Sequence, residues 1–245
     1  MTRLYPMSEW FGRVHAYLLE DGAELTLIDA LGKADARTIL AEMQRHGLAI
    51  QQLKQIILTH GHITHVKGAA TLQRLSGARV YVGAAERAII EGQAPSGLTT
   101  WLPQRPWQVL PQQYLLNLSH VLWQRGIKWE PLIHPPVKVD QVLVGDGEPI
   151  GSVRAYHTPG HSPGCFSFYW PAGEALLVGD AMVTWPKLEL GWRGLTEDYA
   201  QNVASLRRLV AIGEREGWSV RTIATGHGPP LHTTDGIAAI KHLLP

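Results

Sequence analysis

The sequence predicts an α/β protein, and three observations lead to that class. Short apolar runs alternate with helix-like stretches in both halves of the 245-residue chain, as in sheets that helices cover. Apolar residues make up 45% of the chain and charged residues 18%, which supplies a core and is unlike a disordered segment. No apolar run approaches the ~20 residues that cross a bilayer. We therefore expect a single domain over residues 1–245 that has no membrane partner.

Charge and cysteine usage narrow the function classes. Lys and Arg number 22 against 21 Asp and Glu, which leaves a net charge of +1 and predicts no nucleic-acid partner. Cys165 is the only cysteine, so an intramolecular disulfide and a CxxC metal cluster are excluded. The first residues lack the apolar stretch of a signal peptide, and we expect a cytoplasmic location. Against this background, 12 His and 9 Trp stand out.

The elements can be placed in order along the chain. Asp21-Gly22 is typical of a tight hairpin turn between two strands, Gly47 ends the first helix, and Thr196 is expected to cap a long helix. The short apolar runs predict strands at 16–19, 25–28, 56–58, 80–82, 142–144, 153–157, 166–170, 175–178 and 221–225. Apolar stripes of helical period predict helices at 35–46, 66–75, from 196 to at least 210, and 235–244.

Residues 92–138 differ in texture from the rest of the chain, because prolines and tryptophans are concentrated there. The segment is too short to bury a core of its own, so we expect an insertion on the main fold. Its tryptophans are either the core of the insertion or an apolar lid or subunit contact, which leaves a homodimer open. These residues are Trp101, Trp107, Trp123 and Trp129.

Histidines gather where a buried strand ends. The stretch from Thr59 to His65 reads Thr-His-Gly-His-Ile-Thr-His, directly after the strand at 56–58. Neutral imidazole is the commonest protein ligand for zinc. The alternative is a fortuitous cluster, but a solvated turn needs no such group and a packed core rarely takes three. The spacing therefore predicts that His60 and His62 bind a metal.

Three further segments place a His or an Asp at the end of a predicted strand. His161 lies in a loop whose Pro and Gly residues make it rigid. Asp180 follows the strand at 175–178, and His227 lies between two glycines after the strand at 221–225. Taken singly, Asp180 is typical of a turn and His227 of a surface position. Taken together, they extend the histidine pattern.

In this order, the segments resemble the metallo-β-lactamase superfamily over almost the whole chain apart from the insertion. That family carries Thr-His-x-His-x-Asp-His, then Thr-Pro-Gly-His, then Gly-Asp, then Gly-His. The resemblance implies a four-layer αββα sandwich with metals along one edge of its two sheets, and a water or hydroxide as the nucleophile. It also implies two ligand groups that share a bridging carboxylate, namely His60, His62 and His161 for the first metal, His65 and His227 for the second, and Asp180 for both.

Thr64 departs from this pattern, because the family carries Asp at that position. The missing carboxylate would bind the second metal and orient the attacking water, so Thr64 and Asp180 are the catalytic positions that the resemblance implies. A neutral hydroxyl is a poor zinc ligand and brings no negative charge. Three outcomes stay open: a weakened two-metal site, a one-metal site with vestigial second ligands, and an inactive or engineered variant. Zinc is the expected cofactor, as one or two ions, with iron and manganese as alternatives.

Other residues are expected to have supporting or structural roles. Asp29 is predicted to support the site without binding metal, and Cys165 to be a buried structural thiol. Trp185 and Trp192 closely follow Asp180 and are candidates to bind substrate at the pocket mouth. His157 is interpreted as a strand-end residue, with support of a metal ligand as the alternative. Surface positions are predicted for the remaining histidines, which are His15, His46, His120, His134, His232 and His242.

The first functional hypothesis is a metal-dependent hydrolase that cleaves an ester, lactone, thioester or related acyl group of a small molecule. A bound metal lowers the pKa of its water and polarises a carbonyl, so no Ser or Cys nucleophile is needed. The second hypothesis is a mononuclear iron oxidoreductase of the persulfide dioxygenase type, with ligands drawn from His60, His161 and Asp180. The third is a non-catalytic variant of the fold.

Overall fold

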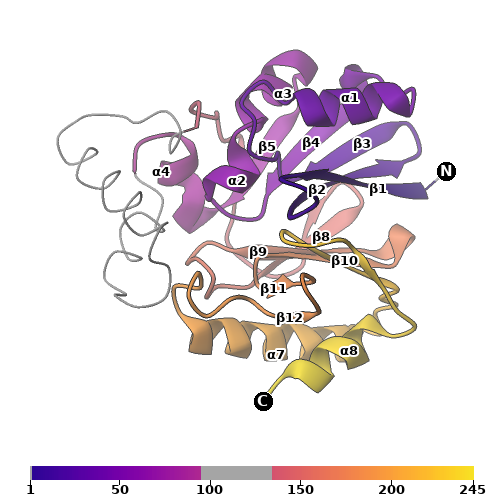
Figure 1. The fold of residues 1–245 in the computed structure, drawn as a ribbon, viewed down its shortest axis with the longest axis vertical. Helices are drawn as coiled ribbons and strands as arrows, with labels where there is room; N and C mark the ends of the chain where they lie inside the picture. The colour runs from indigo at the N-terminus through magenta and orange to yellow at the C-terminus, as the bar shows by residue number, and fades with distance from the viewer. Residues whose placement is uncertain (1, 95–133) are drawn as a thin grey trace.

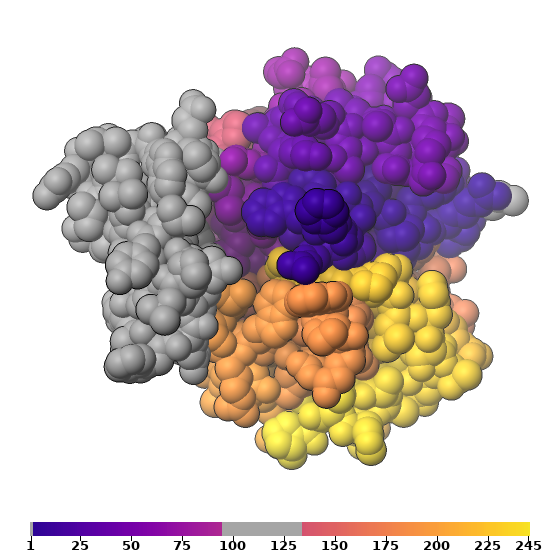
Figure 2. Space-filling model, viewed as in Figure 1, coloured from indigo at the N-terminus to yellow at the C-terminus, as the bar shows by residue number. Residues whose placement is uncertain are grey.

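The computed structural model describes residues 2–94 and 134–245, and these residues form four layers in the order helices, sheet, sheet, helices (Figure 1). The first sheet has the strand order β1-β2-β3-β4-β5-β6, and the second has the order β14-β13-β10-β9-β8-β7. The first sheet uses strands between residues 2 and 143, and the second uses strands between residues 148 and 232. Figure 2 shows the indigo and purple part lying against the orange and yellow part. The predicted αββα sandwich is confirmed.

The first sheet begins with three antiparallel strands, β1 to β3, and the pairs from β3 to β6 are parallel. Its strands are β1 (Thr2–Glu9), β2 (Val14–Asp21), β3 (Glu24–Ile28), β4 (Leu53–Leu58), β5 (Arg79–Gly83) and β6 (Gln141–Leu143). The helical segments of this half are α1 (Arg37–Arg45), η1 (Ile50–Gln52), α2 (Ile63–Val66), α3 (Ala69–Ser76), η2 (Ala84–Glu86) and α4 (Arg87–Ile90).

The second sheet is antiparallel apart from the parallel pair of β10 with β13. Its strands are β7 (Glu148–Ile150), β8 (Val153–His157), β9 (Phe166–Trp170), β10 (Ala175–Gly179), β13 (Thr222–Thr225) and β14 (Leu231–His232). The short pair β11 (Met182–Val183) and β12 (Glu189–Leu190), the turn η5 (Pro171–Gly173) and the helices α7 (Tyr199–Glu216) and α8 (Gly236–Leu243) complete this half.

The continuous apolar strands explain why the protein has four layers. On β4, Ile56 packs in the cluster shared with α1 and α3, whereas its neighbour Ile57 packs in the cluster between the sheets. On β10, Leu177 lies in the cluster between the sheets and Leu176 in the cluster shared with α7 and α8. Because successive side chains point to opposite faces, a strand that is apolar throughout must be covered on both faces.

Three sequence predictions about helices are corrected. The long helix α7 is capped by Asp198, whose side chain accepts a hydrogen bond from the Gln201 N–H. Thr196 lies before it, and its buried hydroxyl has no hydrogen-bond partner among the described residues. Helix α1 begins at Arg37, two residues later than expected. The stripe at 66–75 is divided between α2 and α3, because the N–H of Lys67 bonds to the Leu31 carbonyl. The strands β1, β7, β11, β12 and β14 were not predicted.

The predicted insertion and its four tryptophans fall mainly on residues 95–133, which lie outside the described residues. Its two ends are described and lie close together. Val137 is buried in the core, and its N–H donates a hydrogen bond of 3.1 Å to the Ile90 carbonyl. The main fold therefore includes the last predicted residues of the insertion. Among the helices that the structure describes, none is long and apolar enough to cross a membrane.

Candidate metal centre

Five histidines and one aspartate converge where four strands end. They come from segments that are far apart in the sequence. His60 and His62 follow β4, His65 lies on α2, His161 lies in the loop between β8 and β9, Asp180 follows β10, and His227 follows β13.

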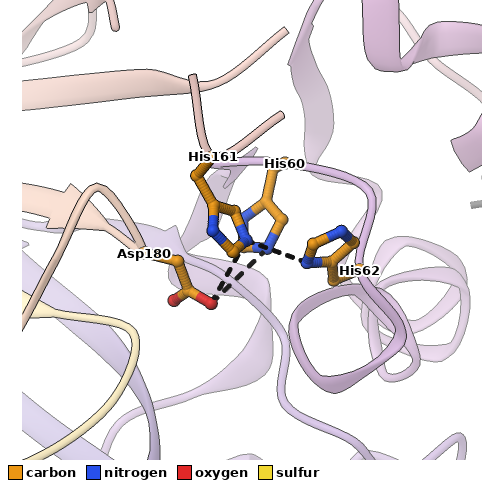
Figure 3. Close-up of side chains that lie close together, drawn as sticks. All are labelled: His60, His62, His161 and Asp180. Carbon is orange, nitrogen blue, oxygen red and sulfur yellow. Dashed lines mark hydrogen bonds and ion pairs between the residues drawn. The ribbon is translucent and has the colours of Figure 1, made fainter. Parts of the chain in front are cut away.

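The first group consists of His60, His62, His161 and Asp180, which are all buried. The His161 Nε2 atom lies 2.9 Å from the His62 Nδ1 atom. The Asp180 Oδ2 atom lies 3.5 Å from the His161 Nε2 atom and 3.8 Å from the His60 Nε2 atom. Figure 3 shows the three rings and the carboxylate facing one another. All four ligand atoms lie within 4.8 Å of one another, close enough for these side chains to surround a single metal ion.

The second group consists of His65, Asp180 and His227. The Asp180 Oδ1 atom lies 3.5 Å from the His65 Nε2 atom, and the Asp180 Oδ2 atom lies 3.1 Å from the His227 Nε2 atom. Asp180 therefore belongs to both groups. This second group has three protein donors, one fewer than the first.

Several buried polar atoms of the cluster lack a hydrogen-bond partner among the described residues. They include the Nε2 atoms of His60 and His65 and the Oδ1 atom of Asp180. Leaving a buried polar group unsatisfied costs about 1–3 kcal/mol, so such atoms require a partner that the protein does not supply. A cation bound among these lone pairs satisfies them, and the residues present thus fit a metal.

The imidazoles of the first group are held in the form that binds metals. Burial lowers the pKa values of His60 and His62 well below the usual range, and neighbouring imidazoles lower them further. Burial also lowers the pKa of His161, to about 4. These three side chains are therefore neutral at pH 7, and a neutral imidazole offers a free lone pair to a metal.

The charged forms of His65 and Asp180 are favoured, in contrast to the neutral imidazoles of the first group. Burial disfavours the charged form of His65, but the carboxylates of Asp180 and Asp29 outweigh it and raise its pKa to about 10. Burial also disfavours the charge on Asp180, yet the imidazoles of His227 and His65 hold the pKa of this carboxyl well below its usual range. In the metal-free protein at pH 7, both ring nitrogens of His65 are therefore protonated. A metal that binds His65 at the second group must displace one of these protons.

We expect the metal-free protein to be most stable near pH 6.5. Since His65 has a raised pKa, its contribution to stability is complete below pH 6.5 and is lost as the pH rises toward about 10. His161 has a lowered pKa, so its contribution is complete above pH 6.5 and is lost as the pH falls toward about 4. Melting temperatures of chelator-treated protein between pH 4 and pH 10 test this expectation, and a steady rise from pH 6.5 to 10 contradicts it.

Asp29 and Thr59 orient two of the candidate ligands. The Asp29 Oδ2 atom lies 3.0 Å from the His65 Nδ1 atom, and its Oδ1 atom accepts a bond of 2.8 Å from the Thr59 N–H. The Thr59 hydroxyl lies 2.9 Å from the His60 Nδ1 atom. Such contacts fix the ring orientation and leave the Nε2 atoms facing the cluster. Asp29 therefore occupies the supporting position that the sequence suggested, whereas Thr59 received no role from the sequence.

Backbone geometry brings Asp180 and His227 to the cluster. The pairing of β10 with β13 shifts register between Leu177 and Gly179, and such a bulge redirects the side chain that follows it. Gly226 passes so close that a Cβ atom there would lie 2.0 Å from the Asp180 Oδ1 atom. Only glycine allows this approach.

The two tryptophans predicted to bind substrate lie beside the second group. The ring centroids of Trp192 and His227 are 5.0 Å apart, and those of Trp185 and Trp192 are 6.4 Å apart. Trp185 is 41% exposed and carries the Arg13 guanidinium 4.6 Å above its ring. Thr64 is half-buried on α2, and no hydrogen bond joins its hydroxyl to another described residue.

The prediction that His15 lies on the surface is wrong. His15 is only 5% exposed on β2, and its N–H donates a bond of 2.9 Å to the Gly226 carbonyl. Burial lowers its pKa to about 4, and its Nδ1 atom has no partner among the described residues. His134 is half-buried, and His120 lies outside the described residues. Cys165 is buried as expected, and burial raises the pKa of its thiol well above the usual range.

The αββα layers and the shared carboxylate between two ligand groups define a class of metal-centre protein. The family model described as the metallo-beta-lactamase superfamily matches residues 10–216. The chain belongs to the metallo-beta-lactamase superfamily.

Curated relatives and solved structures agree with this family. The chain is 32% identical over 169 residues to an uncharacterized Bacillus subtilis protein, YobT, covering 69% of this chain and 61% of that protein. It is 27% identical to the B. subtilis probable metallo-hydrolase YybB, covering 70% and 63%. The chain thus spans about three fifths of the length of these relatives.

Two crystal structures match nearly the whole chain. The B3 metallo-beta-lactamase BLEG-1 has a TM-score of 0.69 at 22% identity, with 99% of this chain and 98% of that chain covered. The protein TTHA1623 in a di-iron-bound form has a TM-score of 0.67 at 25% identity, with 98% of each chain covered. The first of these similarities concerns the fold alone.

Proposed function

We propose that the protein is a metal-dependent hydrolase that cleaves an ester, lactone, thioester or related acyl bond in a small molecule. One observation carries the proposal: three neutral, buried imidazoles and the Asp180 carboxylate face one point, and Asp180 is shared with a second group. Membership of a superfamily that includes probable metallo-hydrolases supports it.

The residues have distinct roles in this proposal. His60, His62, His161 and Asp180 hold the first metal, and His65, Asp180 and His227 hold the second, with zinc as the expected ion. When bound, such metals lower the pKa of water and polarise a carbonyl oxygen. Asp29 and Thr59 keep two of the rings oriented. Trp192 and Trp185 offer an apolar surface beside His227 for the acyl or aromatic part of the substrate.

An iron-dependent oxidoreductase is the second candidate. Two observations favour it: Thr64 stands where a charged second-site ligand is missing, and the similar protein TTHA1623 was crystallised in a di-iron-bound form. A single iron held by His60, His161 and Asp180 would then act on oxygen and a thiol-derived substrate. The homodimer and the cytoplasmic location stay predictions from the sequence.

Metal-depleted protein distinguishes these functions. Samples are reloaded with Zn²⁺, Mn²⁺ or, under anaerobic conditions, Fe²⁺, and each is assayed on 4-nitrophenyl acetate, a simple lactone and a thioester. Oxygen uptake is measured in parallel with a low-molecular-weight persulfide. Metal-restored hydrolysis without oxygen uptake supports the hydrolase. Oxygen uptake that only iron restores supports the oxidoreductase and contradicts our proposal.

Replacing Thr64 by Asp is expected to strengthen the second metal site. The new carboxylate adds a charged ligand next to His65 and offsets the cost of removing water from a second dication near the first. The number of metals per chain is expected to rise from nearer one to nearer two, and ester or lactone hydrolysis to rise with it. Elemental analysis and initial rates check both, with Thr64→Asn as the uncharged control. Two tightly bound metals in the native protein, with no gain in the variant, contradict the prediction.

A further inference from the structure

Glu86 is a buried carboxylate that the proposed chemistry does not use. It is the last residue of η2, after β5, and is 1% exposed. Among the described residues no Lys, Arg or His forms an ion pair with it. A buried carboxylate without a cation is stabilised only if its oxygens accept hydrogen bonds, so the identity of its donors is informative.

Among the described residues, its hydrogen-bond donors all belong to two loops that carry candidate ligands. The Oε2 atom accepts a bond of 2.9 Å from the N–H of Gly61, the residue between His60 and His62. The Oε1 atom accepts bonds of 2.6 Å from the Ser162 hydroxyl and 2.9 Å from the Gly164 N–H. Ser162 directly follows His161, and Gly164 lies two residues further along the same loop. One side chain thus joins loops that are about a hundred residues apart in the sequence.

Both loops are in close contact with this side chain. A Cβ atom at Gly61 would lie 2.8 Å from the Glu86 Oε2 atom, and one at Gly164 would lie 2.6 Å from its Cγ atom. The glycines therefore allow the loops to reach the carboxylate, and neither loop can move toward it without a clash.

The other links between these loops cannot replace Glu86. The contact between His62 and His161 uses a nitrogen of each ring, and those rings are the ones that would turn their lone pairs to a metal. The bond from the Phe166 N–H to the Thr59 carbonyl, 3.1 Å long, joins the loops at their bases, outside the ligand-bearing turns. Glu86 holds the turns themselves.

We infer that Glu86 is a positioning residue that holds His60 and His62 in register with His161, so that the first metal site is formed before the metal binds. The inference rests on the proposed metal site. The carboxylate of Glu86, buried beside the ligand loops, would also offset the charge of a bound dication. Glu86 belongs to neither candidate ligand group.

The variant Glu86→Gln tests this inference with little change in shape. The amide oxygen can keep the bonds to Ser162 and Gly164, but the amide NH₂ then faces the Gly61 N–H and the His60–His62 turn is released. We expect the affinity for Zn²⁺ to fall by ~10–100-fold, the usual effect of losing an outer partner of a metal ligand. Chelator competition measures the affinity, and the visible absorption of the Co²⁺-loaded protein reports the ligand geometry. Ser162→Ala removes one bond and is expected to cause a smaller loss in the same direction.

Glu9 provides a control, although it differs from Glu86 in forming an ion pair with Lys33. It is a buried carboxylate, 5% exposed, that accepts hydrogen bonds from the Gly32 N–H and the Thr38 hydroxyl and from neither ligand loop of the first group. Glu9→Gln is expected to lower the melting temperature of the metal-free protein and to leave Zn²⁺ affinity and the Co²⁺ spectrum unchanged.

Two outcomes overturn the inference. The first is native Zn²⁺ affinity and a native Co²⁺ spectrum in Glu86→Gln, and the second is an equal loss of affinity in Glu9→Gln. If Glu86→Gln does not fold, Ser162→Ala decides, and native affinity in that variant overturns the inference. Failure of the proposed metal site is separate, because the native protein itself would then bind no metal through His60, His62 and His161. Failure of the hydrolase assignment alone leaves the inference intact, since the expected readouts are Zn²⁺ affinity and the Co²⁺ spectrum.

Discussion

Replacing His161 by alanine is expected to remove most of the bound metal and to lower thermal stability sharply. A metal that binds only the folded protein stabilises it by about 4 kcal/mol when its concentration is 1,000 times the dissociation constant. For a chain of this size, that energy corresponds to a melting-temperature loss of roughly 8–16 °C. His161 is expected to have this effect because it is the only ligand of the first group that comes from the β8–β9 loop.

Elemental analysis and melting curves with and without chelator measure the effect. In native protein, chelator is expected to lower the melting temperature, and in His161→Ala it is expected to have little further effect. His232→Ala is the control, since His232 is exposed on β14 and belongs to neither ligand group. Full metal content in His161→Ala shows that the first group is assigned wrongly.

Replacing Asp180 by asparagine is expected to abolish turnover and to weaken both metals. The carboxylate is the member common to both groups, and its charge is the one that faces all five imidazoles. Losing a direct ligand should cost at least the ~100-fold in activity that losing an outer partner can cost. In metal-free protein, the pKa of His65 should also fall from about 10, because Asp180 is the strongest influence that raises it.

Metal content, hydrolysis rates and an NMR titration of His65 in chelator-treated protein test these expectations. Asp140→Asn is a suitable control, since its carboxylate bonds to the Val80 N–H and belongs to neither ligand group. Two metals per chain with native turnover in Asp180→Asn would show that Asp180 is not the shared ligand. An unchanged pKa of His65 would contradict the claim that Asp180 raises this pKa, but not the claim that Asp180 is the shared ligand.

The fold and the candidate ligands could be predicted because their signals are local. Each ligand-bearing segment follows a short apolar strand, and residue type with position narrows the chemistry of each ligand, as for His60 after β4 and Asp180 after β10. His15 was assigned to the surface because no motif surrounds it and it precedes the predicted strand at 16–19, whereas β2 begins at Val14 and is buried on both faces. The cap of α7 was missed because Thr196 and Asp198 are both preferred cap residues, and only the packed structure selects between them.

Glu86 and Thr59 could not have been found from the sequence. Glu86 lies in an unremarkable Ala-Ala-Glu segment, and its role exists only because two distant loops bring Gly61 and Gly164 to it. Thr59 lies next to a candidate ligand, but its hydroxyl acquires a role only when Asp29 is placed beside it. Long-range hydrogen bonds of this kind follow from tertiary packing and leave no periodic pattern in the chain.

The central claim is that three imidazoles and one carboxylate hold a metal, and anomalous X-ray diffraction from crystals of protein purified without added metal tests it most directly. The account predicts an anomalous peak about 2.0–2.1 Å from a nitrogen of each of His60, His62 and His161, next to Asp180. The absence of any peak there after the crystals are soaked in Zn²⁺, or a metal bound elsewhere on the described residues, would contradict it.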